Sequence, residues 1–198
     1  AARSGNLEAV KLLVSMGFEM TMEATKAAAG LKSIDTLTWL VAHGCPLGKS
    51  ACAQASKDGR LENLKWVRER GAEWGPQVCA VAAKFGHHEI LTWARKEGCE
   101  WDSTTLRGAA AGGQFDILRW AVENDCPMTD PLVCASAANG GHTEILRWLR
   151  EEKNFGWDAR TMMYAAEAGH YDIIEYCLAK ACPVDSSVVH AAASANRL

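Results

Sequence analysis

Histidine and cysteine are the residues of this 198-residue chain best suited to chemistry, because both bind transition metals and both serve in catalysis. The chain has six His and eight Cys, with no C-x-x-C pair. His87, His142 and His170 each follow a glycine at the same repeat position, one or two structural units apart. Side chains spaced in this way are too far apart to share one ion. We therefore predict no metal, no cofactor and no catalytic residue.

The cysteines recur at fixed positions rather than in clusters. A site that accepts Cys, Leu, Met or Val is a small apolar slot, in which a free thiol behaves as a small hydrophobe. This use of cysteine favours a reducing compartment, so we expect an intracellular protein of the cytoplasm or nucleus. One position holds Cys45, Cys99, Cys126 and Cys182, a second holds Cys52, Cys79 and Cys134, and Cys177 stands where other units have Leu.

These positions belong to a repeat of 27 or 28 residues. The register is set by a glycine and confirmed by the rarest residue, since all eight Trp fall at two repeat positions. A fixed period in this range is the signature of a stacked repeat architecture. The seven marker residues are Gly5, Lys32, Gly59, Gly86, Gly113, Gly141 and Gly169. The tryptophans are Trp39, Trp66, Trp93, Trp120 and Trp148 seven residues after the marker, and Trp74, Trp101 and Trp157 at the end of the unit.

Bulk properties narrow the possible partners. The net charge of −3 and the pI of about 6.1 leave no basic footprint for nucleic acid. No apolar run reaches the length of a membrane span, so we expect no membrane association. We expect a single repeat domain over residues 1–198, cut inside a repeat at both ends. Uncapped ends would allow end-to-end stacking of an otherwise monomeric protein.

Each unit is predicted to form two short helices. In the fifth unit, the first helix spans roughly Thr104 to Ala111, with Ser103 or Thr104 as its cap. Two glycines break it at 112–113. The second helix spans roughly Phe115 to Glu123 and has one apolar face. In the second unit Lys32 replaces the helix-breaking glycine, so the first helix is expected to run longer there.

The two helices differ in bulk. Paired alanines such as Ala109-Ala110 let first helices approach closely, whereas second helices carry Ile, Leu and Trp. Each unit is therefore a wedge, and the stack should curve with the first helices on its concave side. We expect the tryptophans to lie in the core. Two one-residue insertions, near 129–131 and 153–156, are placed in turns between units.

The unit resembles the ankyrin repeat. Glu89-Ile90-Leu91 after Gly86-His87, and the same run at 141–146, match its central motif, and Gly98-Cys99 stands where ankyrin repeats have Gly-Ala. The resemblance extends over the whole chain and implies that the recurring His binds backbone of the adjoining turn. The sequence also resembles short Trp- and Cys-rich repeats found in large tandem sets in protists, algae and giant viruses.

Two departures from the ankyrin pattern shape the expected fold. The Thr-Pro-Leu-His signature is absent, with 104–107 reading Thr-Thr-Leu-Arg, and the period is about 27 rather than 33 residues. The missing residues fall where ankyrin repeats carry a β-hairpin finger. The expected fold is therefore an all-α, curved helix-turn-helix repeat solenoid without fingers.

The variable positions of the first helices are the predicted binding residues. Charges on the second helices, among them Lys65, Arg68, Arg95, Arg119 and Arg150, are interpreted as a solvated convex face. In the ankyrin family the concave surface binds partners, which by register implies an aromatic anchor with a basic rim. The predicted partner-binding residues are Lys57, Asp58, Lys84, Phe85, Arg107, Asn139, Tyr164 and Glu167.

Three functions remain open at this point. The favoured hypothesis is a non-catalytic module that binds a protein or peptide on its concave face. The alternative is a structural spacer within a larger repeat protein, in which case the variable residues would be neutral. An enzyme is the third, and it lacks a nucleophile, base or metal set. A catalytic or adaptor domain elsewhere in the reading frame would favour the binding module over the spacer.

Overall fold

The computed structural model describes residue 2 and residues 5–195, and all regular elements within them are helical. The chain divides into two compact units, residues 1–100 and 101–198, which are described separately. Unit 1 holds α1 (Leu7–Ser15), α2 (Met22–Ala29), α3 (Asp35–Ala42), α4 (Lys49–Lys57), α5 (Leu61–Glu69), α6 (Pro76–Lys84) and α7 (His88–Lys96). Unit 2 holds α8 (Ser103–Ala111), α9 (Phe115–Glu123), α10 (Leu132–Asn139), α11 (Thr143–Arg147) with its extension η2 (Trp148–Glu152), α12 (Ala159–Ala168), α13 (Tyr171–Ala179) and α14 (Ser187–Ala195).

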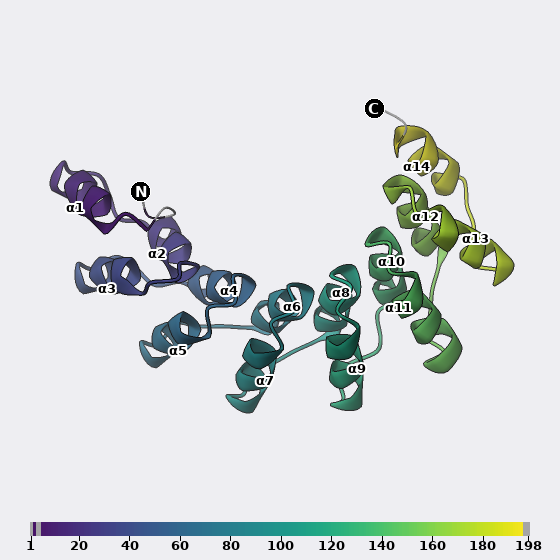
Figure 1. Cartoon of the computed structure of the whole chain (residues 1–198), viewed down its shortest axis with the longest axis horizontal. Coiled ribbons are helices and arrows are strands. Elements are labelled where there is room, and N and C mark those ends of the chain that lie inside the picture. Colours follow the sequence, from purple (N-terminus) through teal and green to yellow (C-terminus); the bar gives the residue numbers. More distant parts are fainter. Residues whose placement is uncertain (1, 3–4, 196–198) are drawn as a thin grey trace. The chain divides into compact units, whose positions relative to one another are not determined.

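Within each unit, neighbouring repeats pack mainly through their first helices. In unit 1 these are α2, α4 and α6, and in unit 2 they are α8, α10, α12 and α14. The paired alanines make this possible, since Ala28, Ala29, Ala82 and Ala83 are fully buried. The second helices α3, α5, α7, α9, α11 and α13 each pack on the first helix of their own repeat and extend away from the row (Figure 1). Within each unit, the first helices therefore lie together along one side of the stacked repeats.

The helix limits agree closely with the sequence prediction in the fifth repeat. The second helix covers Phe115–Glu123, as predicted. The predicted cap was wrong, because Asp102 caps α8 in place of Ser103 or Thr104. Its Oδ1 accepts a hydrogen bond from the backbone N–H of Thr104 at 2.9 Å. An aspartate one residue earlier reaches the free amides of the first turn, and its charge suits the helix dipole.

The first helix of the second repeat ends without a marker glycine. Helix α2 stops at Ala29, so the longer helix predicted there is wrong. The buried amide of Asn63, in the next repeat, donates to the carbonyl oxygens of Ala29 and Leu31 at 3.0 and 2.9 Å. Arg60 donates through Nε to the carbonyl oxygen of Gly30 at 3.2 Å. Side chains of the following repeat therefore satisfy the carbonyls that a continuing helix would have used.

One of the two insertions lies in a helix rather than a turn. The extra residue near 153–156 is absorbed by the π-helical turn Trp148–Glu152, which widens the end of the second helix. After it, Phe155 takes the place that Cys126 has in the preceding repeat, and its N–H donates to the carbonyl of Leu149 at 2.8 Å. The other insertion does lie in the turn before α10.

The tryptophans line the edge of the core instead of filling it. Only Trp148 is buried, at 8% exposed, and the other seven are half-buried. The Trp that ends one repeat packs edge-on against the second-helix aromatic of the next. The ring pairs are Trp74–Trp93 at 5.5 Å, Trp101–Trp120 at 5.7 Å and Trp157–Tyr176 at 6.0 Å between centroids. The predicted core position is therefore corrected for Trp74, Trp93, Trp101, Trp120 and Trp157. Their rings form a series of aromatic pairs along the junctions between repeats.

Second-helix arginines also lie at these junctions. Arg68 lies over the ring of Trp74 at 4.1 Å, and Arg150 lies over Trp157 at 4.4 Å. Arg68, Arg95 and Arg150 are half-buried, and each donates to a turn carbonyl four or five residues later, those of Ala72, Cys99 and Phe155. They were predicted to belong to a solvated face, and that prediction is wrong. Their guanidinium groups secure the turn that replaces a hairpin.

Candidate interaction surface

The recurring histidines hold neighbouring repeats together. Nε2 of His87 lies 2.9 Å from the carbonyl oxygen of Lys57, and Nε2 of His170 lies 3.2 Å from that of Asn139. A carbonyl can only accept, so Nε2 carries the proton in each bond. The rings rest against marker glycines of the preceding repeat, where an added β-carbon would be 2.7 Å from His87 at Gly59 and 2.6 Å from His170 at Gly141.

The thiols also connect neighbouring repeats. All eight cysteines are free and buried. The thiols of Cys45, Cys99, Cys126 and Cys182 each donate to a carbonyl 24 residues earlier, at 3.3 to 3.5 Å. Burial raises the pKa of Cys52 to about 11 and that of Cys134 to about 12. These two groups remain protonated at neutral pH and are poor nucleophiles.

The described residues hold neither a metal-binding cluster nor a membrane-spanning helix. Among them, no three His, Cys, Asp or Glu side chains gather closely enough to hold a metal ion. Within the same residues, no helix combines the length and the apolarity needed to cross a bilayer.

Four of the predicted binding residues come together in unit 1. Lys57, Lys84 and Phe85 lie at the ends of the neighbouring helices α4 and α6, on the first-helix surface. The ammonium groups of Lys57 and Lys84 lie 5.5 and 5.9 Å from the centroid of the Phe85 ring, which is 43% exposed. In the part of the chain that the structure describes, neither ammonium pairs with a carboxylate. An exposed ring thus lies between two cations that have no carboxylate partner among the described residues.

Asp58 lies beside this cluster, at the wall of a cleft between α2 and α4. The cleft has a volume of about 350 Å³ and is lined by Glu23, Lys26, Ala27, Gly30, Leu31, Gln54, Lys57 and Asp58. The amide of Gln54 donates to Asp58, whose carboxylate oxygen occupies the place that a β-carbon at Gly30 would take. Gln54 and Gly30 stand at variable first-helix positions but were not among the predicted partner-binding residues, although Gly30 takes the position that is Lys57 or Lys84 in later repeats.

Lys57 belongs to both features, and this links them. It lines the cleft and also contacts the Phe85 ring. We define Lys57, Asp58, Lys84 and Phe85, with the cleft, as the unit 1 patch. The patch combines an aromatic ring, two unpaired cations, a carboxylate and an amide. Groups of this kind bind polypeptide side chains and backbone.

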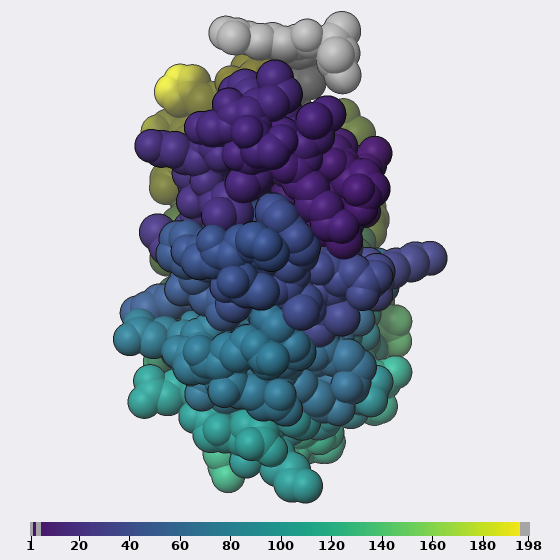
Figure 2. Space-filling view, turned by 90° about the vertical axis from the view of Figure 1, so that its left-hand side faces the viewer, coloured from purple at the N-terminus to yellow at the C-terminus, as the bar shows by residue number. Residues whose placement is uncertain are grey.

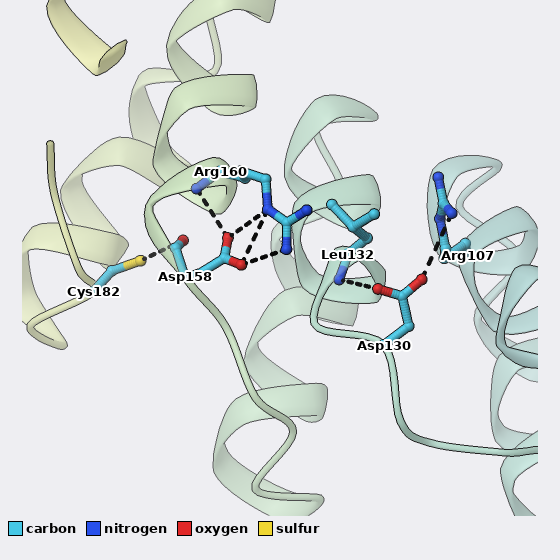
Figure 3. A network of polar contacts seen from close by, with 6 residues as sticks. All are labelled: Arg107, Asp130, Leu132, Asp158, Arg160 and Cys182. Atoms are coloured by element: carbon cyan, nitrogen blue, oxygen red, sulfur yellow. Dashed lines mark hydrogen bonds and ion pairs between the residues drawn. The ribbon is translucent and has the colours of Figure 1, made fainter. Parts of the chain in front are cut away.

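The other four predicted residues lie in unit 2 and form no comparable cluster. Asn139 and Glu167 are exposed at the ends of α10 and α12, and Tyr164 is half-buried on α12. Arg107 is engaged by Asp130 at 3.6 Å, and Asp130 in turn accepts from the N–H of Leu132 (Figure 3). In the same view, the guanidinium group of Arg160 forms an ion pair with Asp158, whose side chain caps α12. The charge of Arg107 is therefore already partnered within the fold.

Comparison with solved structures identifies the architecture. The ankyrin repeat domain of human ASB11 superimposes with a TM-score of 0.58 over 78% of this chain and 82% of that one, at 15% sequence identity. The chain has the ankyrin-repeat fold. No protein-family model matches the sequence, and no curated protein sequence matches it either.

Within the ankyrin-repeat fold, this chain is a short-period, all-helical solenoid. The described residues contain no strand, so the turns between repeats carry no hairpin. In place of the hairpin, the Arg–Trp contacts and the capping aspartates fix the short turn.

Proposed function

We propose that the protein is a non-catalytic interaction module that binds a protein or peptide on its first-helix surface, with the unit 1 patch as the principal contact. The ankyrin-repeat fold supports a binding role in general, because repeat arrays present extended surfaces of this kind. The observation that carries the choice of site is the exposed Phe85 ring between two unpaired lysines, beside an open cleft.

The chemistry of the patch favours one kind of partner segment. An apolar side chain would pack on Phe85, while carboxylates on either side would pair with Lys57 and Lys84. The cleft is lined largely by polar and charged groups and suits hydrogen-bonding side chains more than an apolar plug. An aromatic anchor with charged groups at its rim is a common arrangement in interfaces.

The experiment is a comparative capture with three baits. The first is the wild-type chain, and the second carries Lys57→Glu, Lys84→Glu and Phe85→Ala. The third carries Lys65→Glu and Lys96→Glu on second helices, so that its net charge changes by the same amount as that of the patch variant. Circular dichroism and urea midpoints first establish that all three are folded to the same extent.

The expected result is a protein that wild type and the second-helix variant retain equally and that the patch variant loses. Equal retention by all three baits would place binding elsewhere and refute the patch. If no bait retains a specific partner, the protein is better described as a spacer. The spacer hypothesis thus has its own outcome in the same experiment.

A further inference from the structure

A hollow lies on the second helices of unit 2, between the start of α9 and the helix formed by α11 and η2. It has a volume of about 180 Å³ and is lined by Phe115, Glu144, Arg147, Trp148, Glu151 and Glu152. The two aromatic rings of this lining meet edge to face, with 5.5 Å between their centroids. Trp148 is buried and Phe115 is half-buried. The hollow therefore combines two aromatic rings with three carboxylates.

The π-helical turn η2 supplies half of this lining. Trp148, Glu151 and Glu152 all belong to it. A π-helical turn holds more residues than an α-helical turn, and such turns are frequent at functional sites. Helix α9, the second helix of the preceding repeat, is α-helical from Phe115 to Glu123. The hollow is thus formed in part by a local departure from the repeat.

Two of the three carboxylates have no cation partner in the described part of the chain. Glu151 forms an ion pair with Lys180 at 3.0 Å and accepts a hydrogen bond from the hydroxyl of Tyr176 at 3.3 Å. The side chains of Glu144 and Glu152 are exposed and form neither an ion pair nor a hydrogen bond with the described residues. These two carboxylates are therefore free to accept from a ligand that enters the hollow.

Cations of the chain lie over both aromatic rings but leave the hollow open. Arg119 lies over Phe115 at 5.4 Å, and Lys153 lies over Trp148 at 5.1 Å. Neither of these cations belongs to the lining. Arg147 does belong to it, and its guanidinium lies over a tyrosine ring of α13 at 5.3 Å. The two rings therefore already attract positive charge, while the space between them and the free carboxylates remains open.

The charge of unit 2 favours a basic ligand. Residues 101–198 carry 13 acidic and 8 basic side chains, which gives a net charge of −5. Residues 1–100, the purple to teal segments that fill most of Figure 2, carry 11 acidic and 13 basic side chains and a net charge of +2. A surface with an excess of one charge raises the local concentration of ligands of the opposite charge. Unit 2 therefore attracts a basic segment, whereas unit 1 does not.

The contacts within the chain indicate which cation suits an aromatic ring here. Three arginines lie over tryptophan rings at 3.6, 4.1 and 4.4 Å, whereas the lysine over Trp148 stays at 5.1 Å. A planar guanidinium stacks on a ring and donates to a carboxylate at the same time. The volume of the hollow is below the roughly 300–1,000 Å³ of pockets for drug-sized molecules, so it suits a single side chain.

We propose that this hollow binds one arginine side chain of a basic polypeptide segment. The guanidinium group lies against the rings of Phe115 and Trp148, and it donates to the carboxylates of Glu144 and Glu152. Basic residues beside the arginine are held by the negative charge of unit 2. The site lies on second helices, whereas the unit 1 patch lies on first helices, so the two sites can be tested separately.

Titration of the ¹⁵N-labelled protein with a defined peptide tests the site by nuclear magnetic resonance. The probe is the blocked peptide Gly-Gly-Lys-Arg-Lys-Gly-Gly, and the matched probe has citrulline, the uncharged analogue, in place of arginine. The arginine peptide should shift the indole N–H of Trp148 and the amides of 115–123 and 143–152. The citrulline peptide should bind about tenfold more weakly, because it loses the charge-assisted bonds to the carboxylates.

Two variants of the hollow should weaken binding of the arginine peptide. Phe115→Leu removes one ring and keeps apolar bulk, and the fold tolerates leucine at this position because Leu7 and Leu61 occupy it in other repeats. The double variant Glu144→Gln, Glu152→Gln removes both free carboxylates. Circular dichroism first establishes equal helix content. The double variant should weaken binding about tenfold, and Phe115→Leu by about threefold.

A charge-matched control separates the hollow from the general acidity of unit 2. The double variant Glu123→Gln, Asp125→Asn loses the same two charges at exposed positions outside the lining. It should retain the affinity of wild type to within about twofold, since distant surface charges are largely screened. Weakening equal to that of the Glu144 and Glu152 variant would mean attraction by net charge alone and would overturn the proposal. So would an arginine peptide that shifts no resonance of the hollow, or a citrulline peptide that binds equally well.

Discussion

The imidazole of His87 lies so close to Gly59 that a β-carbon there would be 2.7 Å from its Cε1 atom. The same ring is bonded to the carbonyl oxygen of Lys57 at 2.9 Å. Gly59 also has a φ of +72°, in the left-handed region that other residues rarely adopt. Glycine is therefore required at this position for two separate reasons. Its backbone conformation is left-handed, and the histidine ring of the next repeat leaves no room for a β-carbon.

Substitution at Gly59 and at Gly71 separates these two reasons. Gly71 has a φ of +79° with open space around it, so Gly71→Ala should cost only backbone strain, about 1–2 kcal/mol of unfolding free energy. Gly59→Ala should cost roughly 1–3 kcal/mol more, because the His87 ring must move. Urea denaturation measures both. Equal losses at the two positions would show that the histidine does not fix the spacing between repeats.

Arg68 should contribute more to stability than its position on a second helix indicates. Arg68→Ala removes the donor to the Ala72 carbonyl and the cation over Trp74, and should cost about 1.5–3 kcal/mol. Lys65→Ala on the same helix breaks only an exposed ion pair with Glu62 and should cost much less than Arg68→Ala. Urea midpoints of the two variants decide the matter. If both variants lose similarly little unfolding free energy, Arg68 behaves as an ordinary solvated surface residue.

Asn63 is expected to be the most sensitive polar residue of unit 1. Its buried amide caps α2 from the next repeat, and Asn63→Ala leaves the carbonyls of Ala29 and Leu31 without their donor. The expected loss is about 2–4 kcal/mol. Hydrogen exchange should also quicken at the end of α2. Asn124→Ala, which removes an exposed bond to the Trp120 carbonyl, is the control and should change exchange only locally.

Acid should weaken unit 2 through the cap of α12. The side chain of Arg160 donates to Asp158 and holds the pKa of that carboxyl below its usual value, and the N–H of Arg160 acts in the same direction. A depressed pKa in the folded state gives stability that is complete above the unfolded pKa of about 4. That stability is lost as the pH falls through the lower folded pKa. Asp158→Asn should flatten the slope of unfolding free energy against pH below about pH 4, while keeping a capping side chain. An unchanged slope in this variant would exclude the Asp158–Arg160 contact as its source.

Local pattern was sufficient for most of the fold. The period, the paired alanines and the apolar face of 115–123 predicted two helices per repeat because burial in a stacked array imposes the same requirement on every unit. The marker glycines predicted the helix ends, since a left-handed residue stops a helix wherever it occurs. Where Lys32 replaced that glycine the prediction failed, because the helix is ended by Asn63 and Arg60 from the next repeat.

The sequence by itself determined the repeat, its helical content and the positions of the variable residues on the first helices. Tertiary structure alone decided which charged groups are free. Lys57 and Arg107 both read as exposed cations on first helices, yet Lys57 remains unpaired beside Phe85 while Arg107 is held by Asp130. Likewise, only the structure shows that Arg68 and Arg150 lie over the tryptophan rings at the junctions between repeats. Such pairings depend on distances between side chains of neighbouring repeats, and these exist only once the repeats are stacked.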